Sequence, residues 1–157
     1  MGLKGKLIVS TEVKCGGHLF HDLYQTSCHH ISNISPDKIH HFCIHEGESL
    51  KAGSIIGWKF NHDGKVRVTK QLIEAIDDEK KSITWKVLEG DTLELYNSFT
   101  ITASFENDWA TWTFVYEKKI EDTPEPLNLL GFMLDVTKDL EAHLHVTTKD
   151  TEAPLLK

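Results

Sequence analysis

Histidine and cysteine side chains gather in the first third of the chain, where imidazole and thiol groups could hold a metal ion. His41, Cys43 and His45 alternate along one expected strand, so their side chains share a face. Both side-chain types are zinc ligands, but positions i, i+2 and i+4 of a strand span about 13 Å. That span is too wide for one tetrahedral ion. We therefore expect exposed histidines here and no metal site.

Three residues are candidates for proton transfer: His18, His21 and Asp135. The two histidines are three residues apart on an expected short helix, and imidazole titrates near neutral pH. Asp135 lies beside the apolar stripe of an expected long helix, where burial would raise its pKa and suit a general base. A solvated surface is the more common place for such side chains. No local motif pairs a nucleophile with a base, so the sequence leaves catalysis an open question.

Large aromatic residues at alternating positions form the most informative group. They either fill a solid core, as most aromatic rows in sheets do, or line a cavity for a ligand. A strongly bent sheet covered by one helix encloses more volume than its side chains need, which favours a cavity for a hydrophobic small molecule. Tyrosine hydroxyls there would orient the polar end of the ligand. The expected ligand-binding residues are Tyr24, Trp58, Phe60, Trp85, Tyr96, Phe99, Trp112, Phe114, Tyr116, Met133 and Thr137.

The elements that must position these residues follow from the spacing of apolar side chains. Every second residue is apolar along much of 93–105 and 110–116, which is typical of antiparallel strands with one buried face. After Pro126 the apolar residues recur every three or four positions, which is typical of a helix. The alternation slips between Leu72 and Ile73, which indicates a bulge. The sequence predicts strands at 7–13, 39–46, 53–61, 65–76, 82–89, 93–105 and 109–117, short helices at 18–24 and 27–34, and a long helix to about residue 146.

Size and composition are those of an ordinary globular protein. The 157 residues carry a formal net charge of −7, so we expect no attraction for the phosphates of nucleic acids. Three cysteines without C-x-x-C spacing indicate neither a disulfide framework nor a zinc site. Without a signal peptide or an apolar run of about 20 residues, we expect a cytoplasmic protein with no membrane span. We expect a single domain at 1–146 and a flexible tail at 147–157.

Eight short segments carry a family resemblance: Met1–Leu7, Ser35–Ile39, His45–Glu48, Asp63–Lys65, Ile73–Asp77, Leu88–Asp91, Trp112–Lys118 and Val136–His143. In this order they resemble the major latex proteins, plant proteins of the Bet v I-type, pathogenesis-related superfamily. The resemblance covers residues 1–146. It implies an α+β helix-grip (START-like) fold, in which a seven-stranded antiparallel sheet wraps around a long C-terminal helix. Two short helices after the first strand and a large internal cavity are also implied.

The same resemblance implies a function. Family members bind hydrophobic metabolites and are associated with defence or specialised metabolism, so we expect a metabolite carrier. As an alternative, some relatives are enzymes that cyclise or isomerise terpenoid or alkaloid intermediates in the same cavity. A third possibility is a defence regulator that acts on other proteins. We expect no cofactor, and a monomer or weak dimer.

One segment departs from the family pattern. The loop 47–53 has glycine at Gly47 and Gly53 alone, where many relatives are glycine-rich. Such a loop offers few free backbone N–H groups to a phosphate. The sequence therefore argues against nucleotide binding and against ribonuclease activity.

Overall fold

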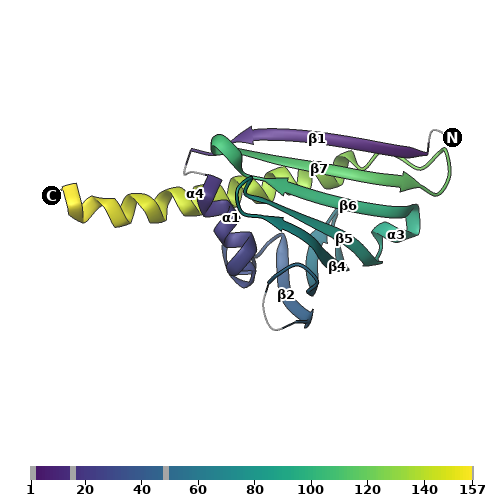
Figure 1. The fold of residues 1–157 in the computed structure, drawn as a ribbon, viewed down its shortest axis with the longest axis horizontal. Helices are drawn as coiled ribbons and strands as arrows, with labels where there is room; N and C mark the ends of the chain where they lie inside the picture. Colours follow the sequence, from purple (N-terminus) through teal and green to yellow (C-terminus); the bar gives the residue numbers. More distant parts are fainter. Residues whose placement is uncertain (1–2, 15–16, 48–49, 157) are drawn as a thin grey trace.

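The computed structural model describes residues 3–14, 17–47 and 50–156, with side chains up to residue 144. It has the predicted α+β helix-grip architecture: seven antiparallel strands form one curved sheet, and the long helix α4 (Leu127–Leu156) packs against it (Figure 1). The strands are β1 (Lys4–Glu12), β2 (Ile39–Glu46), β3 (Ile55–His62), β4 (Lys65–Asp77), β5 (Ser82–Gly90), β6 (Tyr96–Ser104) and β7 (Trp109–Lys118). The shorter helices are α1 (Gly17–Thr26), η1 (Cys28–His30), α2 (Ile31–Ile34), α3 (Thr92–Leu95) and η2 (Glu106–Asp108).

The strand order is β1-β7-β6-β5-β4-β3-β2, so the first strand of the chain lies beside the last one (Figure 1). Their pairing runs from Lys4 opposite Glu117 to Glu12 opposite Trp109. Successive strands from β2 to β7 are neighbours. The sheet is therefore open, with β1 and β2 as its two edges.

Alternation along the strands separates an inner from an outer face. In β7, Trp112 and Phe114 are fully buried, whereas Val115 next to them is 48 % exposed. On α4, Val136 and Leu140 are four positions apart and are also buried, as the helical spacing predicts. The hydrophobic core thus lies between the inner face of the sheet and α4.

Helix α1 closes one end of this core. Phe20 and Tyr24 stack on Phe105, the residue after β6, with ring centroids 5.4 and 5.7 Å apart. The thiol of Cys28 in η1 donates a hydrogen bond of 2.8 Å to the carbonyl oxygen of Tyr24. Both predicted short helices are present, and the second is divided into η1 and α2.

Strand β4 is irregular in the region where the sequence predicts a bulge. Its pairing with β5 shifts between Lys70 and Gln71, and again between Ile73 and Ala75. Such shifts bend a strand and change the direction in which its side chains point. The turn before β4 also follows its sequence signal, because Asp63 and Gly64 have φ values of 54° and 75°, as tight hairpins require.

Two predicted boundaries are wrong. Leu93 and Leu95 alternate like strand residues, but they lie in α3, and β6 begins at Tyr96. Gly90 ends β5 with φ 132°, a value that side chains disfavour, and the chain then makes one helical turn before it re-enters the sheet. Helix α4 continues to Leu156 instead of ending near 146, because no proline interrupts it before Pro154.

The division into a domain at 1–146 and a tail at 147–157 stays a prediction. The backbone of 147–156 is helical, and Figure 1 shows that this part of α4 extends past the end of the sheet. The side chains of 145–156 and all of residue 157 lie outside the described residues.

Candidate ligand-binding cavity

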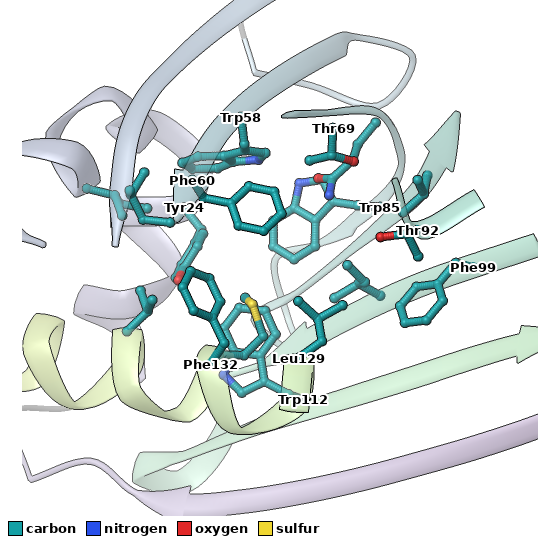
Figure 2. Close-up of a pocket in the computed structure, with 17 residues that line it drawn as sticks. Tyr24, Trp58, Phe60, Thr69, Trp85, Thr92, Phe99, Trp112, Leu129 and Phe132 are labelled. Carbon is teal, nitrogen blue, oxygen red and sulfur yellow. The ribbon is translucent and has the colours of Figure 1, made fainter. Parts of the chain in front are cut away.

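A cavity of about 80 Å³ lies between the inner face of the sheet and α4 (Figure 2). Strands β2 to β7 supply its walls, α4 covers it, and α1 and α2 close one end. Most of its lining is aromatic or aliphatic. The lining residues are Tyr24, Ile31, Ile39, Trp58, Phe60, Thr69, Gln71, Trp85, Val87, Thr92, Phe99, Ile101, Trp112, Leu129, Phe132, Met133 and Val136.

Aromatic rings fill much of the interior. Trp85 and Trp112 stack with centroids 6.2 Å apart, and Tyr24 contacts both edge-on at 5.8 and 5.6 Å. Across the cavity, Phe132 of α4 packs on Phe60 of β3 at 5.6 Å. An engineered apolar cavity of about 150 Å³ accommodates benzene. The cavity is therefore smaller than the large one that the family resemblance implies, because these rings occupy the space.

The lining carries no formal charge among the described residues, since it contains no aspartate, glutamate, lysine, arginine or histidine. Trp112 satisfies its indole N–H by donating a 3.0 Å hydrogen bond to Oγ1 of Thr137. Thr137 in turn donates to the carbonyl oxygen of Met133 at 2.7 Å. Burial, and after it the nearby Cys28 thiol, raise the pKa of the Tyr24 hydroxyl above its usual value. The cavity wall is thus uncharged over the whole physiological pH range.

Most of the expected ligand-binding residues face this cavity. Those that line it are Tyr24, Trp58, Phe60, Trp85, Phe99, Trp112 and Met133. Thr137 is fully buried behind Trp112 and supports its indole instead of lining the cavity. Phe114 and Tyr116 are buried in the core away from the cavity lining.

The hydroxyls of Tyr96 and Tyr116 hold the segment before α4. Tyr96 donates to the carbonyl oxygen of Pro124, and Tyr116 donates to the carboxylate of Glu125. The carboxylate of Glu125 also pairs with Lys118. These contacts fix where α4 begins, so both tyrosines act through the helix that covers the cavity.

The lining residues that the sequence analysis missed are mostly aliphatic residues on strands and residues of α4 next to Met133. Leu129 and Phe132 stand on the same helical stripe as Met133, so the helical period could have identified them. Gln71 is a polar residue that is 7 % exposed, and polarity argued against an inward position. Because the pairing of β4 is irregular, the sequence does not show which of its residues point to the inner face of the sheet.

A second hollow of about 240 Å³ adjoins the cavity at the end where α4 begins. It lies between the β3–β4 hairpin, α3 and residues 124–129, and it shares Phe60, Thr92 and Leu129 with the cavity. Tyr96 contributes to this hollow. Arg67 of β4 pairs with Asp91 at 3.1 Å across it. The hollow is thus more polar than the cavity that it adjoins.

The three candidates for proton transfer lie outside both hollows. His18 and Asp135 are exposed. His21 is 5 % exposed, and its Nε2 lies 3.9 Å from a carboxylate oxygen of Asp78 in the turn between β4 and β5. The described lining of the cavity therefore offers no general base, whereas the adjoining hollow is lined by His62, Asp63, Asp91 and Glu125.

His41, Cys43 and His45 lie on the outer face of the sheet, around a shallow surface hollow beside Gly57. The Sγ of Cys43 and the Nε2 of His45 are 3.6 Å apart. No group of three or more metal-ligating side chains in the described part of the chain is arranged to hold an ion. Likewise, none of the described helices combines the length and the apolar composition that crossing a bilayer requires.

Comparisons with known proteins agree with this fold. The model of the pathogenesis-related protein Bet v 1 family matches residues 2–147. MLP-like protein 43 from Arabidopsis thaliana is 42 % identical over 148 residues, which cover 90 % of this chain and 94 % of that protein. MLP-like protein 28 from Arabidopsis thaliana is 34 % identical over 97 % of this chain, which spans 47 % of that longer protein.

Solved structures give the same picture. Ginseng major latex-like protein 151 from Panax ginseng has a TM-score of 0.88 and 42 % sequence identity, covering 90 % of this chain and 98 % of that one. A norcoclaurine synthase from Thalictrum flavum has a TM-score of 0.66 and 15 % identity, covering 89 % and 87 %. At that identity the likeness concerns the fold alone.

Proposed function

The chain belongs to the pathogenesis-related protein Bet v 1 family, and on that premise we propose that it binds and carries a hydrophobic plant metabolite in the cavity under α4. The observation that carries the proposal is the uncharged, largely aromatic lining between sheet and helix. Removal of apolar surface from water, at about 25 cal/mol per Å², would drive binding. We also propose that the protein acts in the cytoplasm and takes part in defence or specialised metabolism.

Binding must enlarge the cavity, because about 80 Å³ is too small for a metabolite of terpenoid size. Trp58, Phe132 and Met133 are half-buried, so they have more freedom to move than the fully buried rings. Methionine is unbranched and adapts to new shapes at small cost. We propose that these three side chains move towards the adjoining hollow when a ligand enters.

A carrier fits the cavity better than an enzyme does. Cyclisation and isomerisation need a group that gives or takes a proton next to the substrate. The described lining of the cavity has no imidazole, carboxylate or amine, and such groups, among them His62, line the adjoining hollow instead. Tight enclosure by aromatic rings provides retention without a reactive group.

Titration with the neutral fluorescent probe N-phenyl-1-naphthylamine tests the proposal. We expect saturable binding with fluorescence enhancement, weakened at least about tenfold by Leu129→Trp, because Leu129 borders both the cavity and the adjoining hollow. Leu127→Trp is the matched control, since Leu127 is on the same helix and 60 % exposed. Circular dichroism would verify that both variants fold.

The carrier proposal is refuted by a wild-type protein that shows no saturable binding of the probe. It is also refuted if folded Leu129→Trp binds the probe as tightly as Leu127→Trp does. If the probe binds as expected, mass spectrometry of small molecules extracted from protein purified from its native tissue would identify the natural ligand.

A further inference from the structure

We propose that the cavity contains a polar subsite, centred on the side-chain amide of Gln71, that selects uncharged hydrophobic ligands bearing a hydroxyl or carbonyl oxygen. The inference rests on the proposed ligand-binding function and specifies the chemical class of the ligand. Trp85 and Tyr24 complete the subsite.

The position of Gln71 is set by the irregular pairing of β4. Gln71 follows the first shift in register and pairs with Val87 of β5, while Ile73 pairs with Trp85. Gln71 and Trp85 are therefore diagonal neighbours on adjacent strands, and both line the cavity. Gln71 is 7 % exposed and Trp85 is 4 % exposed, so neither is a surface residue.

The hydrogen bonds of the lining show which polar groups are still available. The Trp112 indole is bonded to Thr137, and the Thr69 hydroxyl donates to the carbonyl oxygen of Glu89 at 3.3 Å. By contrast, the side-chain amide of Gln71 has no hydrogen-bond partner among the described residues. The same holds for the hydroxyl of Tyr24, which contacts Trp85 edge-on with ring centroids 5.8 Å apart.

The polar side-chain atoms of Gln71 and Tyr24 are not among the described polar atoms that are fully buried without a partner, so they border open space that a bound molecule can reach. An amide offers two donors and one acceptor, and a tyrosine hydroxyl offers one donor and accepts as well. This combination can bond a hydroxyl group or a carbonyl oxygen of a ligand. An ionised ligand, in contrast, would lose its hydration without meeting an opposite charge on the described lining.

Three probes of similar shape test the subsite by displacement of N-phenyl-1-naphthylamine: naphthalene, 2-naphthol and 2-naphthoate. The measured quantity is the ratio of the naphthalene Kd to the 2-naphthol Kd, which cancels the common apolar contribution. We expect Gln71→Met, which keeps the side-chain length, to lower this ratio about three- to tenfold relative to wild type. Gln25→Met is the matched control, because Gln25 is the other glutamine and does not line the cavity.

We also expect 2-naphthoate to bind wild type at least about tenfold more weakly than 2-naphthol. An equal ratio in wild type and in Gln71→Met, with probe binding intact, overturns the subsite and leaves the carrier function standing. Equal affinities for 2-naphthol and 2-naphthoate overturn the selection for uncharged ligands. Absence of saturable probe binding to wild type overturns both proposals.

A second measurement needs no variant and therefore no assumption about folding. In nitrogen-15 NMR spectra of the wild-type protein, the two glutamine side chains give separate NH₂ signals. We expect 2-naphthol, but not naphthalene, to shift the Gln71 signal while the Gln25 signal stays in place. Equal shifts of the Gln71 signal with both molecules would contradict a hydrogen bond to the oxygen.

Discussion

The hydrogen bond between Trp112 and Thr137 joins the sheet to the helix that covers it. Both residues are fully buried, and the 3.0 Å bond from the indole nitrogen to Oγ1 is the partner that the indole needs away from water. The hydroxyl also bonds back to the carbonyl oxygen of Met133 within α4. One threonine thus stabilises a wall of the cavity from behind.

Removing that hydroxyl should leave the indole N–H buried without a partner. We expect Thr137→Val, which keeps the shape of the side chain, to lower the free energy of unfolding by about 1–3 kcal/mol. Urea unfolding followed by circular dichroism measures the loss. In a Trp112→Phe background the same change should cost less, because the orphaned donor is gone. Equal losses in both backgrounds would show that the hydrogen bond is not the cause.

Asp139 of α4 ties the helix to the segment between α2 and β2. Partial burial acts to raise its pKa, but hydrogen bonds from Lys38 and Ser35, together with the Lys38 charge, outweigh burial and hold the pKa of Asp139 below its usual value. The hydrogen bond to Asp139 raises the pKa of Lys38. Both groups are therefore charged at neutral pH.

The sign of each shift gives the pH dependence. A lowered carboxylate pKa stabilises the fold above the ordinary value of about 3.9, and this contribution is lost as pH falls through the lowered pKa. A raised lysine pKa contributes below about 10.4 and is lost only as pH rises through the raised pKa. Between about pH 5 and 9 both contributions are complete.

We expect Asp139→Asn to lower the free energy of unfolding by about 1 kcal/mol or less at pH 7, because the Asp139 side chain is 38 % exposed. The difference from wild type should stay constant up to pH 9 and shrink as pH falls below about 4. Urea titrations at pH 9, 7, 4 and 2.5 measure it, with the exposed Asp22→Asn as control. A difference that grows on acidification would contradict the assigned ion pair.

At the scale of elements, the edge strand β1 and the start of α4 meet at Tyr116. A Cβ atom on Gly5 of β1 would lie within 2.6 Å of the Tyr116 hydroxyl oxygen, too close for any contact. Tyr116 is 2 % exposed and its hydroxyl is bonded to Glu125, so its ring has little room to move. Glycine at position 5 thus permits β1 to pair beside β7.

Two glycine-to-alanine changes should therefore act in opposite directions. We expect Gly5→Ala to destabilise the protein by about 1–3 kcal/mol through the clash with Tyr116. Gly131→Ala in α4 should stabilise it by about 0.5–1 kcal/mol, because a Cβ there meets no atom within 4 Å and alanine favours helices. Thermal unfolding of both variants measures the effects. Destabilisation by Gly131→Ala would refute the open space described at that position.

The type and order of the elements could be predicted from the sequence because each has one buried face. Strict alternation in β7 and the helical stripe of α4 report that face directly. The alternation of Leu93 and Leu95 wrongly predicted a strand, because the backbone conformation at Gly90 decides the conformation of the next turn. Short turns of this kind depend on local dihedral angles more than on apolar spacing.

The cavity lining could be predicted only in part. Alternation predicts that Trp112, Phe114 and Tyr116 all point to the inner face of the sheet. The path of α4 over the sheet decides which of them lines the cavity. That path depends on contacts between residues far apart in the sequence, such as Tyr96 with Pro124 and Trp112 with Thr137. Gln71 could not be found from hydropathy, because its inward position follows from the irregular strand β4.

At the scale of the whole molecule, the part of α4 that extends past the sheet can be tested for its contribution. The described core contains Val136 and Leu140, with Leu144 packed against it. We predict that residues 1–146 fold without 147–157, with a melting temperature within about 3 °C of the full chain and the same affinity for N-phenyl-1-naphthylamine. A larger fall in melting temperature would show that the domain includes the C-terminal residues.

The charges around the cavity determine how a ligand of the proposed carrier would be released. No imidazole or carboxylate lines the described cavity, so under the proposed function acid would act on release only through the adjoining hollow, where His62, Asp91 and Glu125 lie. Salt would act at the same place, by screening the ion pair between Arg67 and Asp91. Under the proposed function, a bound molecule would therefore be released where α4 begins, by opening of this charged hollow or by transfer to a receiver with a higher affinity.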